Sequence, residues 1–482
     1  MVADLASIPL NPSSDTPIYR QLADGIGSLI KRQVLRPGDK LPPTRELAGQ
    51  LGLNRTTISA AYAALDELGL ISGKVGRGSF VAERRPVTAS DPPREAATEI
   101  LNGVSFVSSR PAAIDFPLEQ FRRFTREVAD APEAADILQL GSARGYPPLR
   151  RYLLDEAVAT GVAGPGDDLI ITNGCQQALD LVAHVCAAGA SIAVEDPVYH
   201  GMLRAFARSG ADMFGVPVDD AGMDVVALEA ILERHRPKLV AITPSFQNPT
   251  GATLSLSRRQ RVVALAERFD CTVVEIDIYS PLRYAGEALP TLKELSRGSN
   301  VLLLRSYSKV CFPGLRVGWA IGPSPLIARL AEAKEISDLH SDQLSQAVLL
   351  RFAQSGELDR HLLRTREIGK QRLEAVLDAC ERYLPPGTRW THPEGGMSLW
   401  VELPAPLTAD ALLKKAQLRG VEFLPGQHFA ARESHARGLR ISFGALSPAE
   451  IRRGIQILGE SAAFEMNALL STGDRESLPA LV

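Results

Sequence analysis

The chain has 482 residues, of which 45% are hydrophobic and 23% are charged, and its formal net charge is −3. This length is too great for one hydrophobic core, so we expect two to four domains, and the net charge favours no particular partner. No apolar stretch approaches the roughly 20 residues that span a bilayer, and the N-terminus lacks the pattern of a signal peptide. The five cysteines have no metal-ligand spacing, which predicts no metal site and favours reduced thiols in a cytoplasm.

Charge is unevenly distributed along the chain. Residues 1–85 carry 11 Lys and Arg against 8 Asp and Glu, whereas the remaining residues carry 42 against 48. A small basic head on an acidic body is a weak indication of nucleic-acid binding.

Three short helices are predicted within residues 17–68. The first runs from Pro17 to Leu35 on its helical apolar spacing. The second is RELAGQL, with Thr44 as its N-cap and Gly52 at its end. The third follows the N-cap Asn54 and would bury one stripe, formed by Ile58, Ala61, Tyr62, Leu65 and Leu68. Two helices across the tight LGLN turn predict a helix-turn-helix.

Polar residues crowd the first turn of the third helix. Arg55, Thr56, Thr57 and Ser59 would reach phosphates and base edges in a major groove. The segments LIS and SFV then flank the glycine-rich KVGRG, which predicts a two-stranded wing with Arg77 at its tip. An amphipathic helix pair usually only packs, but helix, helix-turn-helix and wing in this order favour DNA binding.

The segments PIYRQLADGI, LRPGDKLPPTRELAGQLGLNRTTISAAYAAL and GRGSFV resemble the winged helix-turn-helix of GntR-type bacterial transcription regulators. The resemblance covers nearly all of residues 15–83, which we assign as the DNA-binding domain, and it implies that the partner is operator duplex DNA. It also implies which residues approach the operator, namely Arg45, Arg55, Thr56, Thr57 and Gly76.

A large body follows. Residues 84–105 are assigned as a linker because they combine proline, alanine and charge without periodicity. The strand-like runs DLIIT, SIAVED, LVAITP, CTVVEID and VLLLRS alternate with helical patterns, which predicts an α/β domain with a mostly parallel sheet. LWVEL, GVEFLP and GLRISFG predict strands of a smaller α+β domain. We therefore assign the body to residues 106–465, divided into 106–330 and 331–465, and a tail to 466–482.

Several candidate ligand-binding motifs would lie at the carboxyl ends of the strands, where open α/β sheets bind ligands. TNGCQQALDL opens a helix whose first N–H groups would face an anion. EDPVYHG places an aromatic ring past a strand, QNPTG fixes an asparagine, and VEIDIY places an aspartate and a tyrosine at a strand end. Each motif alone is also compatible with a structural role, such as a helix cap, a filled corner or a salt bridge.

Lys309 stands in LRSYSKVCFPGLRVGW between an aliphatic run and an apolar turn. Its ammonium would be poorly hydrated there, so the lysine should be either paired with a nearby carboxylate or deprotonated. One ligand would satisfy the whole set of motifs: pyridoxal 5′-phosphate, with Lys309 forming a Schiff base to its aldehyde. The expected contacts are a helix N-terminus at Gly174, Cys175 and Gln176 with Ser306, Ser308 and Arg316 for the phosphate, Tyr199 for the ring face, Asp277 for the ring nitrogen, and Asn248 and Tyr279 for the ring oxygen.

The order GCQQ, DPVY, NPTG, DIY, SYSK, R, GLRISF resembles fold-type I aminotransferases of the aspartate aminotransferase class over about residues 110–465. The resemblance implies that Arg440 holds the α-carboxylate of a substrate or effector. A GntR-type head on such a body resembles the MocR subfamily of regulators, which implies a homodimer whose heads cross toward the partner's body. The chain departs from the class at LGSARG, where Leu140 replaces the tyrosine that usually reaches the neighbouring subunit's phosphate.

Two functions are compatible with these patterns. The first is a cytoplasmic transcription regulator that senses an amino acid, an amine or the cofactor itself. The second is a working aminotransferase that carries a DNA-binding head. A cycle between the two forms of the cofactor with a keto acid would distinguish the enzyme from the regulator.

Overall fold

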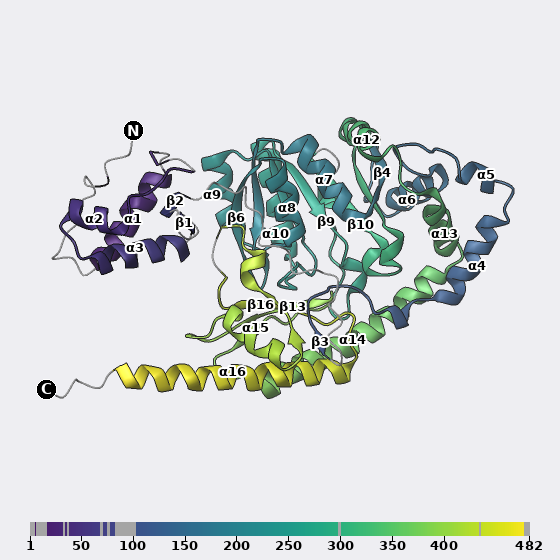
Figure 1. Cartoon of the computed structure of the whole chain (residues 1–482). Coiled ribbons are helices and arrows are strands. Elements are labelled where there is room, and N and C mark those ends of the chain that lie inside the picture. Colours follow the sequence, from purple (N-terminus) through teal and green to yellow (C-terminus); the bar gives the residue numbers. More distant parts are fainter. Residues whose placement is uncertain are drawn as a thin grey trace. The chain divides into compact units, whose positions relative to one another are not determined.

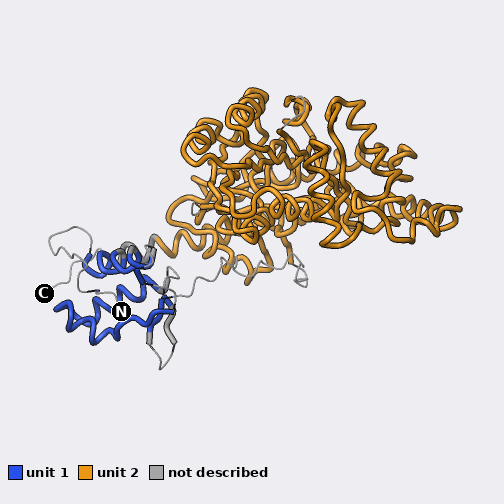
Figure 2. Tube along the Cα trace, turned by 90° about the horizontal axis from the view of Figure 1, so that it is seen from above, with its two compact units in different colours: residues 1–91 blue, residues 92–482 orange. Residues whose placement is uncertain are grey.

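A computed structural model of the protein describes residues 5, 17–31, 34–35, 38–67, 71–74, 78–81, 103–296, 300–432 and 435–476. These residues belong to two compact units, which Figure 2 shows in different colours: residues 1–91, called the head, and residues 92–482, called the body. Most of the predicted linker, the wing-tip residues Gly76 and Arg77, and residues 477–482 lie outside the described residues.

The head consists of three helices and a two-stranded antiparallel sheet (Figure 1): α1 Ile18–Lys31, α2 Thr44–Leu51, α3 Arg55–Glu67, β1 Ile71–Lys74 and β2 Gly78–Val81. The helices share a core because their apolar spacing puts one face of each helix inward. Leu22 and Ile26 of α1, Leu47 of α2, and Ile58 and Leu65 of α3 are fully buried in it. The helix-turn-helix and the two wing strands are therefore present as predicted.

The turn between α2 and α3 shows how the sequence sets the helix ends. Gly52 ends α2 in the left-handed conformation, with φ of 64°. The Asn54 side chain accepts a hydrogen bond from the Thr56 N–H at 3.1 Å, which confirms the predicted cap of α3. The predicted cap of α2 is wrong. Thr44 is already helical, and Pro43 holds the cap position without a side-chain hydrogen bond, because proline's fixed φ suits the extended entry.

The large domain of the body is built on an eight-stranded sheet in the order β4-β11-β10-β9-β8-β5-β6-β7. The strands are β4 Asp167–Asn173, β5 Ser191–Asp196, β6 Asp212–Asp219, β7 Gly222–Met223, β8 Leu239–Ile242, β9 Thr272–Ile276, β10 Val301–Ser306 and β11 Val317–Pro323. Strands β6, β5, β8, β9 and β10 are parallel, whereas β11 and β7 run antiparallel to their neighbours. The five predicted strands and the mostly parallel sheet are confirmed.

Helices cover both faces of this sheet (Figure 1). On one face of the sheet, Leu169 and Ile171 of β4 pack against α6 Pro147–Ala159 and α13 Gln343–Gln354. The side chain of Ile170 lies on the opposite face and packs against a second group of helices. This alternation follows from the two-residue period of a strand. The helices around Ile170 are α7 Gly174–Cys186, α8 His200–Arg208 and α12 Ser324–Asp338, and the remaining helices of the large domain are α4 Leu118–Ala129, α5 Ala134–Ile137, α9 Val225–His235, α10 Leu256–Phe269 and α11 Leu292–Leu295.

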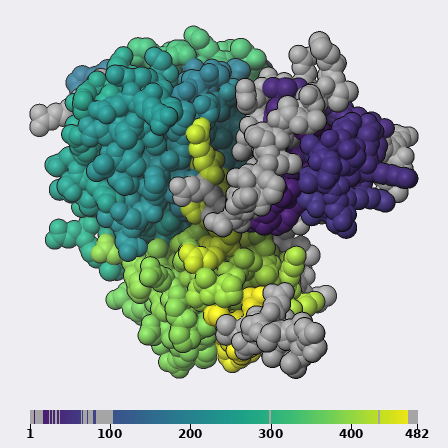
Figure 3. Space-filling view, turned by 90° about the vertical axis from the view of Figure 1, so that its left-hand side faces the viewer, coloured from purple at the N-terminus to yellow at the C-terminus, as the bar shows by residue number. Residues whose placement is uncertain are grey.

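The small domain lies against the large domain, as Figure 3 shows in green to yellow and teal. Its four-stranded sheet has the order β12-β13-β16-β15. The elements are β12 Arg389–Trp390, β13 Ser398–Glu402, β15 Leu424–Pro425, β16 Gly438–Ser442, α14 Glu357–Tyr383, α15 Ala409–Leu418 and α16 Pro448–Glu476. A separate parallel pair joins β3 Val104–Ser105 to β14 Val421–Glu422. Helix α16 thus extends beyond residue 466, where the predicted tail begins.

Within the part of the chain that the structure describes, no helix is long and apolar enough to cross a membrane. The same residues contain no cluster of three or more His, Cys, Asp or Glu side chains suited to a metal ion.

Candidate cofactor and effector site

A cavity of about 110 Å³ opens at the carboxyl ends of the parallel strands. Gly174 and Asp277, two of the predicted cofactor residues, lie beside its wall: Gly174 precedes Cys175, and Asp277 lies between Ile276 and Ile278, which line the cavity. The other predicted cofactor residues line the cavity directly: Cys175, Gln176, Tyr199, Asn248, Tyr279, Ser306, Ser308, Lys309 and Arg316. The fold therefore brings together motifs that are spread over more than a hundred residues.

The N-terminus of α7 forms one end of the cavity and is suited to an anion. No side chain caps this helix, so its first N–H groups and the positive end of its dipole are available to a ligand. Arg316 lies beside it and donates from Nη2 to the Asn173 carbonyl oxygen at 3.2 Å. A Cβ atom at Gly174 would come within 2.5 Å of that Nη2, so glycine permits this approach. The hydroxyls of Ser306 and Ser308, 3.0 Å apart, add further polar groups to the wall.

A network around Asp338 fixes the start of α7. Asp338, the last residue of α12, accepts hydrogen bonds from the Asn173 side chain at 2.8 Å and the Gln177 side chain at 2.6 Å. Its other oxygen pairs with the Lys334 ammonium at 2.6 Å. The Lys334 side chain is fully buried, and burial lowers its pKa. The carboxylate therefore joins a buried cation to the two residues that hold the helix start.

The Asp277 carboxylate follows β9 and is almost completely buried. Its Oδ2 accepts two hydrogen bonds from the Arg305 guanidinium, at 2.9 and 3.1 Å. Its Oδ1 is buried and has no hydrogen-bond partner among the described residues. An unpaired buried carboxylate oxygen is costly, so a cationic N–H donor such as a protonated ring nitrogen would complete the site.

Lys309 ends the 3₁₀ turn Tyr307–Lys309 that follows β10. Its Nζ donates to the Ser109 carbonyl oxygen at 2.5 Å and lies 5.6 Å from the centre of the Tyr279 ring. Among the described residues, no ion pair joins Lys309 to a carboxylate. The lysine therefore donates a hydrogen bond to a backbone carbonyl. The sequence patterns predicted only pairing with a carboxylate or deprotonation.

Arg440 lies on β16 and is 1% exposed. Its Nη1 donates to Asn248 Oδ1 at 2.9 Å, and its Nη2 donates to the Val107 carbonyl oxygen. Asn248 in turn donates to the Tyr279 hydroxyl at 3.4 Å. Arg440 is therefore linked by hydrogen bonds to Asn248 and Tyr279, the two residues predicted to contact the ring oxygen. A carboxylate bound to this guanidinium would lie beside the cofactor cavity.

The wall of the cavity near α8 combines an aromatic ring with a neutral thiol. The Gln176 side chain donates to the Gly201 carbonyl oxygen at 3.1 Å. A Cβ atom at Gly201 would meet the Tyr199 ring at 2.4 Å, so glycine allows the ring to lie against the helix start. Burial raises the pKa of the Cys175 thiol to about 12, which keeps it protonated near neutral pH.

Sequence reasoning missed several parts of this site. The cavity is also lined by Leu179, Met202, Thr243, Ile276 and Ile278, which are ordinary core residue types and carry no chemical signal of their own. Period-2 alternation around VEIDIY would have placed the two isoleucines on the face opposite Asp277. The Asp338 network had no comparable signal, because a Lys and an Asp four residues apart are common on helices.

The predicted operator contacts and Leu140 lie elsewhere. In the head, Arg45, Arg55 and Thr56 are exposed and Thr57 is partly exposed, at the N-terminal ends of α2 and α3. Their contact with DNA remains a prediction. In the body, Leu140 is 77% exposed and lines a separate cavity of about 440 Å³, so it takes no part in the cofactor cavity of its own subunit.

Family models match both units. Residues 115–458 match aminotransferase class I and II, and residues 18–81 match the bacterial regulatory proteins of the gntR family. The chain is 36% identical to aromatic-amino-acid aminotransferase 1 of Thermococcus litoralis over 75% of this chain and 88% of that protein. It is 27% identical to the probable rhizopine catabolism regulatory protein MocR of Rhizobium meliloti over 93% of this chain and 94% of that protein.

A solved structure confirms the fold of the body. LysN, the α-aminoadipate aminotransferase of Thermus thermophilus complexed with N-(5′-phosphopyridoxyl)-L-leucine, matches with a TM-score of 0.72 and 34% identity over 77% of this chain and 95% of that chain. The body is thus a fold-type I domain, and its cofactor is pyridoxal 5′-phosphate. The chain belongs to the aminotransferase class I and II family, and its GntR-type head gives it the architecture of the MocR-type regulators.

Proposed function

We propose that this protein is a transcription regulator that binds an operator through its head and senses an amino compound, or pyridoxal phosphate itself, in its body. The observation that carries this proposal is the presence of both parts in one chain: a helix-turn-helix with exposed cations and a cavity whose polar groups match the cofactor. A DNA-binding head can function without a cofactor cavity, and a cofactor cavity can function without a DNA-binding head. Their presence in one chain therefore indicates that ligand binding and DNA binding are connected.

The cofactor would lie in the cavity with its phosphate at the N-terminus of α7. When bound, pyridoxal phosphate supplies an aldehyde that captures primary amines and a ring that withdraws electrons. Lys309 would hold the aldehyde, and Asp277 would keep the ring nitrogen protonated. Tyr199 would cover the ring face. The phosphate would accept hydrogen bonds from Ser306, Ser308, Arg316 and the first N–H groups of α7, and Asn248 and Tyr279 would donate to the ring oxygen.

An amino-acid effector fits this site because Arg440 offers a planar donor pair near the cofactor cavity. A carboxylate can accept two parallel hydrogen bonds from one guanidinium. The buried position of Arg440 strengthens such a pair, since little water competes for it. The effector's amine would then meet the cofactor aldehyde, and the identity of its side chain stays open.

The head would act in a homodimer whose heads cross toward the partner's body. Two heads on paired half-sites multiply contacts that are weak singly, because each head offers few cations. Arg45, Arg55, Thr56 and Thr57 would contact the operator, with Gly76 and Arg77 at the wing. Binding to an operator would place the protein in the cytoplasm, on the nucleoid.

A working aminotransferase is the second candidate. The likeness to the Thermococcus litoralis enzyme favours it, as does the placement of the predicted cofactor residues around one cavity. An enzyme must interconvert the aldehyde and amine forms of the cofactor at a useful rate with a keto acid, whereas a sensor needs only to bind.

One experiment tests both candidates. The full-length protein, freed of cofactor, is titrated with pyridoxal phosphate and then with each proteinogenic amino acid, while absorbance is followed and DNA duplexes selected from a random pool are bound in parallel. A regulator shows a lysine-bound cofactor band and a change in duplex affinity with an amino compound or the cofactor. Turnover with a keto acid and constant duplex affinity would instead establish the enzyme. A protein that binds no cofactor would overturn both.

A further inference from the structure

Residues 104–111, called the strap, begin with the last two residues of the predicted linker, which form β3, and lead into the rest of the body. Val104 donates its N–H to the Gly420 carbonyl oxygen and Phe106 donates to the Glu422 carbonyl oxygen, both at 2.8 Å. Ser442 on β16 donates its N–H to the Phe106 carbonyl oxygen at 3.1 Å. The first half of the strap is therefore part of the small domain.

The middle of the strap contacts both cations of the candidate site. The Val107 carbonyl oxygen accepts from Arg440, and the Ser109 carbonyl oxygen accepts from Lys309 Nζ at 2.5 Å. The Ser109 hydroxyl also lies 2.8 Å from the Ser442 hydroxyl, and both serines are buried. Ser109 thus joins the lysine of the large domain to the strand of the small domain that carries Arg440.

The contact with Lys309 differs from the other hydrogen bonds of the strap. Within the described part of the chain, every other hydrogen bond from residues 104–111 to another segment goes to the small domain. The hydrogen bond from Lys309 is therefore the one by which the strap is held to the large domain. It is also charge-assisted when the lysine is an ammonium, which makes it one of the stronger contacts of the strap.

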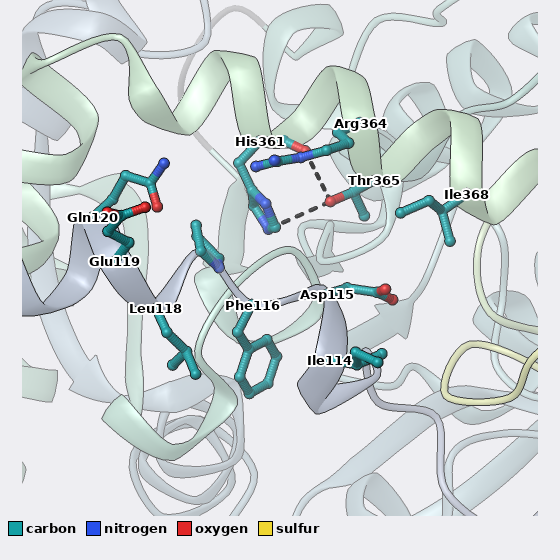
Figure 4. Close-up of a pocket in the computed structure, with 11 residues that line it drawn as sticks. Ile114, Asp115, Phe116, Leu118, Glu119, Gln120, His361, Arg364, Thr365 and Ile368 are labelled. Carbon is teal, nitrogen blue, oxygen red and sulfur yellow. Dashed lines mark hydrogen bonds between the residues drawn. The ribbon is translucent and has the colours of Figure 1, made fainter.

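The segment after the strap is fixed to both domains, because Phe116 packs against Phe312 of the large domain and Asp115 contacts the long helix of the small domain. Asp115 pairs with Arg372 of α14 at 2.8 Å. Figure 4 shows residues 114–120 facing His361, Arg364, Thr365 and Ile368 of the same helix across an open cavity of about 420 Å³. A change at Ser109 is therefore restrained on its C-terminal side, and on its N-terminal side it reaches the linker only by shifting the hydrogen bonds between the strap and the small domain.

We propose that the Lys309–Ser109 hydrogen bond is a latch that reports the state of the lysine to the strap and, through the linker, to the head. This inference rests on the proposed function. When Lys309 is bonded to the cofactor aldehyde, its Nζ no longer donates a hydrogen bond to the Ser109 carbonyl oxygen, and the latch is open. When a primary amine takes its place, the C=N bond to Lys309 breaks, a C=N bond to the incoming nitrogen forms, and the two protons of that amine pass to Lys309. The freed Nζ then donates to Ser109 again, and the latch closes.

The buried carbonyl gives the latch its driving force. A buried carbonyl oxygen needs a donor, and Lys309 is the donor that the structure gives to Ser109. An open latch leaves that oxygen unsatisfied unless the strap moves, so the strap has two arrangements that the lysine selects. A sensor built in this way responds to the amine group of its effector, and Arg440 adds selectivity for a carboxylate.

The test measures hydrogen–deuterium exchange of residues 104–111 in the full-length protein in three states: without cofactor, with pyridoxal phosphate, and with pyridoxal phosphate plus methoxyamine. Methoxyamine serves as the probe because it takes the aldehyde from the lysine without needing the effector pocket. We expect slow, fast and slow exchange of the strap in that order. The fast state should exceed the others by about ten- to hundredfold, as expected for loss of one charge-assisted contact.

Two variants of one residue sharpen the test. Lys309→Ala removes the donor, so its strap should exchange fast in all three states. Lys309→Arg keeps a donor but cannot bond to the aldehyde, so its strap should exchange slowly in all three. Affinity for a selected duplex should differ between the two variants by at least about fivefold, the lower end of usual allosteric coupling. Exchange of β5 and β8 serves as the folding control for both proteins.

The outcomes separate the latch from the proposed function. If pyridoxal phosphate gives no lysine-bound band in the wild type, the proposed function fails. If the band forms but strap exchange does not change, or if Lys309→Ala and Lys309→Arg exchange alike, the latch is wrong and the proposed function stands. Equal duplex affinity of the two variants would overturn the connection from the strap to the head.

Discussion

The head and the body use charge in opposite ways. In the head, Arg45 and Arg55 are exposed on helix starts. In the body, Asp277 and Arg440 are almost completely buried, and each is held by hydrogen bonds. Exposed cations add individually weak contacts to a phosphate backbone and are screened by salt. Buried charges demand fixed partners, so they define a rigid site that discriminates between ligands.

The same contrast predicts how much stability each unit loses when a charged side chain is removed. A surface charge can be lost at a cost of about 1 kcal/mol or less, whereas loss of one member of a buried pair costs about 3–5 kcal/mol. We therefore expect substitutions in the body to change ligand binding and stability together, and substitutions in the head to change DNA affinity with little effect on folding.

The largest effect is expected at Arg440. Arg440→Ala should weaken the response to carboxylate-bearing amino acids by about 2–5 kcal/mol, because a buried charge pair loses one member. Binding of pyridoxal phosphate should persist. The matched control is Arg437→Ala, three residues away, which removes a half-exposed ion pair with Glu402. Absorbance titrations with amino acids measure both, and equal responses of the two variants would place the effector carboxylate elsewhere.

The next largest effect is expected at Asp338, which holds the start of α7. Asp338→Asn should lower the stability of the body by about 3 kcal/mol, because Lys334 stays buried without its counter-charge. It should also reduce the preference for pyridoxal phosphate over pyridoxal, since only the phosphate uses the helix start.

A second pair with the same spacing provides the control. Asp378 and Arg382 of α14 are also four residues apart, but both are exposed. Asp378→Asn should therefore change stability by less than about 1 kcal/mol. Fluorescence titrations with the two vitamers measure the preference. If Asp338→Asn weakens both vitamers equally, its role is structural and is not specific to the phosphate end.

A smaller effect is expected in the head. Arg55→Ala should lower the affinity for a selected duplex by about 1–3 kcal/mol if Arg55 reads a base, and the loss should depend on sequence. Arg20→Ala, at an exposed position of α1, is the control. Gel-shift titrations at several salt concentrations distinguish a base contact from a phosphate contact, which would change the salt slope instead. Unchanged affinity would remove Arg55 from the interface.

The sequence predicted elements better than the contacts between them. The stripe of α3 follows from helical periodicity, and strand β10 follows from the continuous apolar run in VLLLRS, because both patterns are local. Motif order predicted which residues meet in the cofactor cavity. It did not predict the hydrogen bond between Ser109 and Lys309, which are 200 residues apart, because a backbone oxygen carries no side-chain signal. Strand β11 was missed as well, since its sequence VGWAIGP contains Gly and Pro, which are depleted in strands.

The smallest effect, when it is expressed per pH unit, is expected from two buried carboxyl groups of the body. Burial raises the pKa of Glu195 on β5 to about 8, and burial also raises that of Glu275 on β9 to about 7. Between pH 4.5 and these values, an unfolded carboxyl group releases a proton that the folded protein keeps. Folding stability is therefore greatest at the low end of this window and falls as pH rises, by at most about 1.4 kcal/mol per pH unit for each group.

Glu195→Gln tests this slope, because glutamine is neutral at every pH and can still accept the Thr243 N–H, which lies 3.0 Å from Glu195 Oε2. The variant should lose the part of the slope that extends toward pH 8. Glu229→Gln is the control, since the hydrogen bond from Arg261 lowers the pKa of Glu229 and its titration lies below the window. The three tryptophans of the chain, Trp319, Trp390 and Trp400, all lie in the body, so urea unfolding followed by their fluorescence reports this unit and not the head. If Glu195→Gln keeps the wild-type dependence of folding stability on pH between pH 5 and 8, the Glu195 carboxyl is ionised in the folded protein. Its buried charge is then stabilised more strongly than its hydrogen bonds alone would explain.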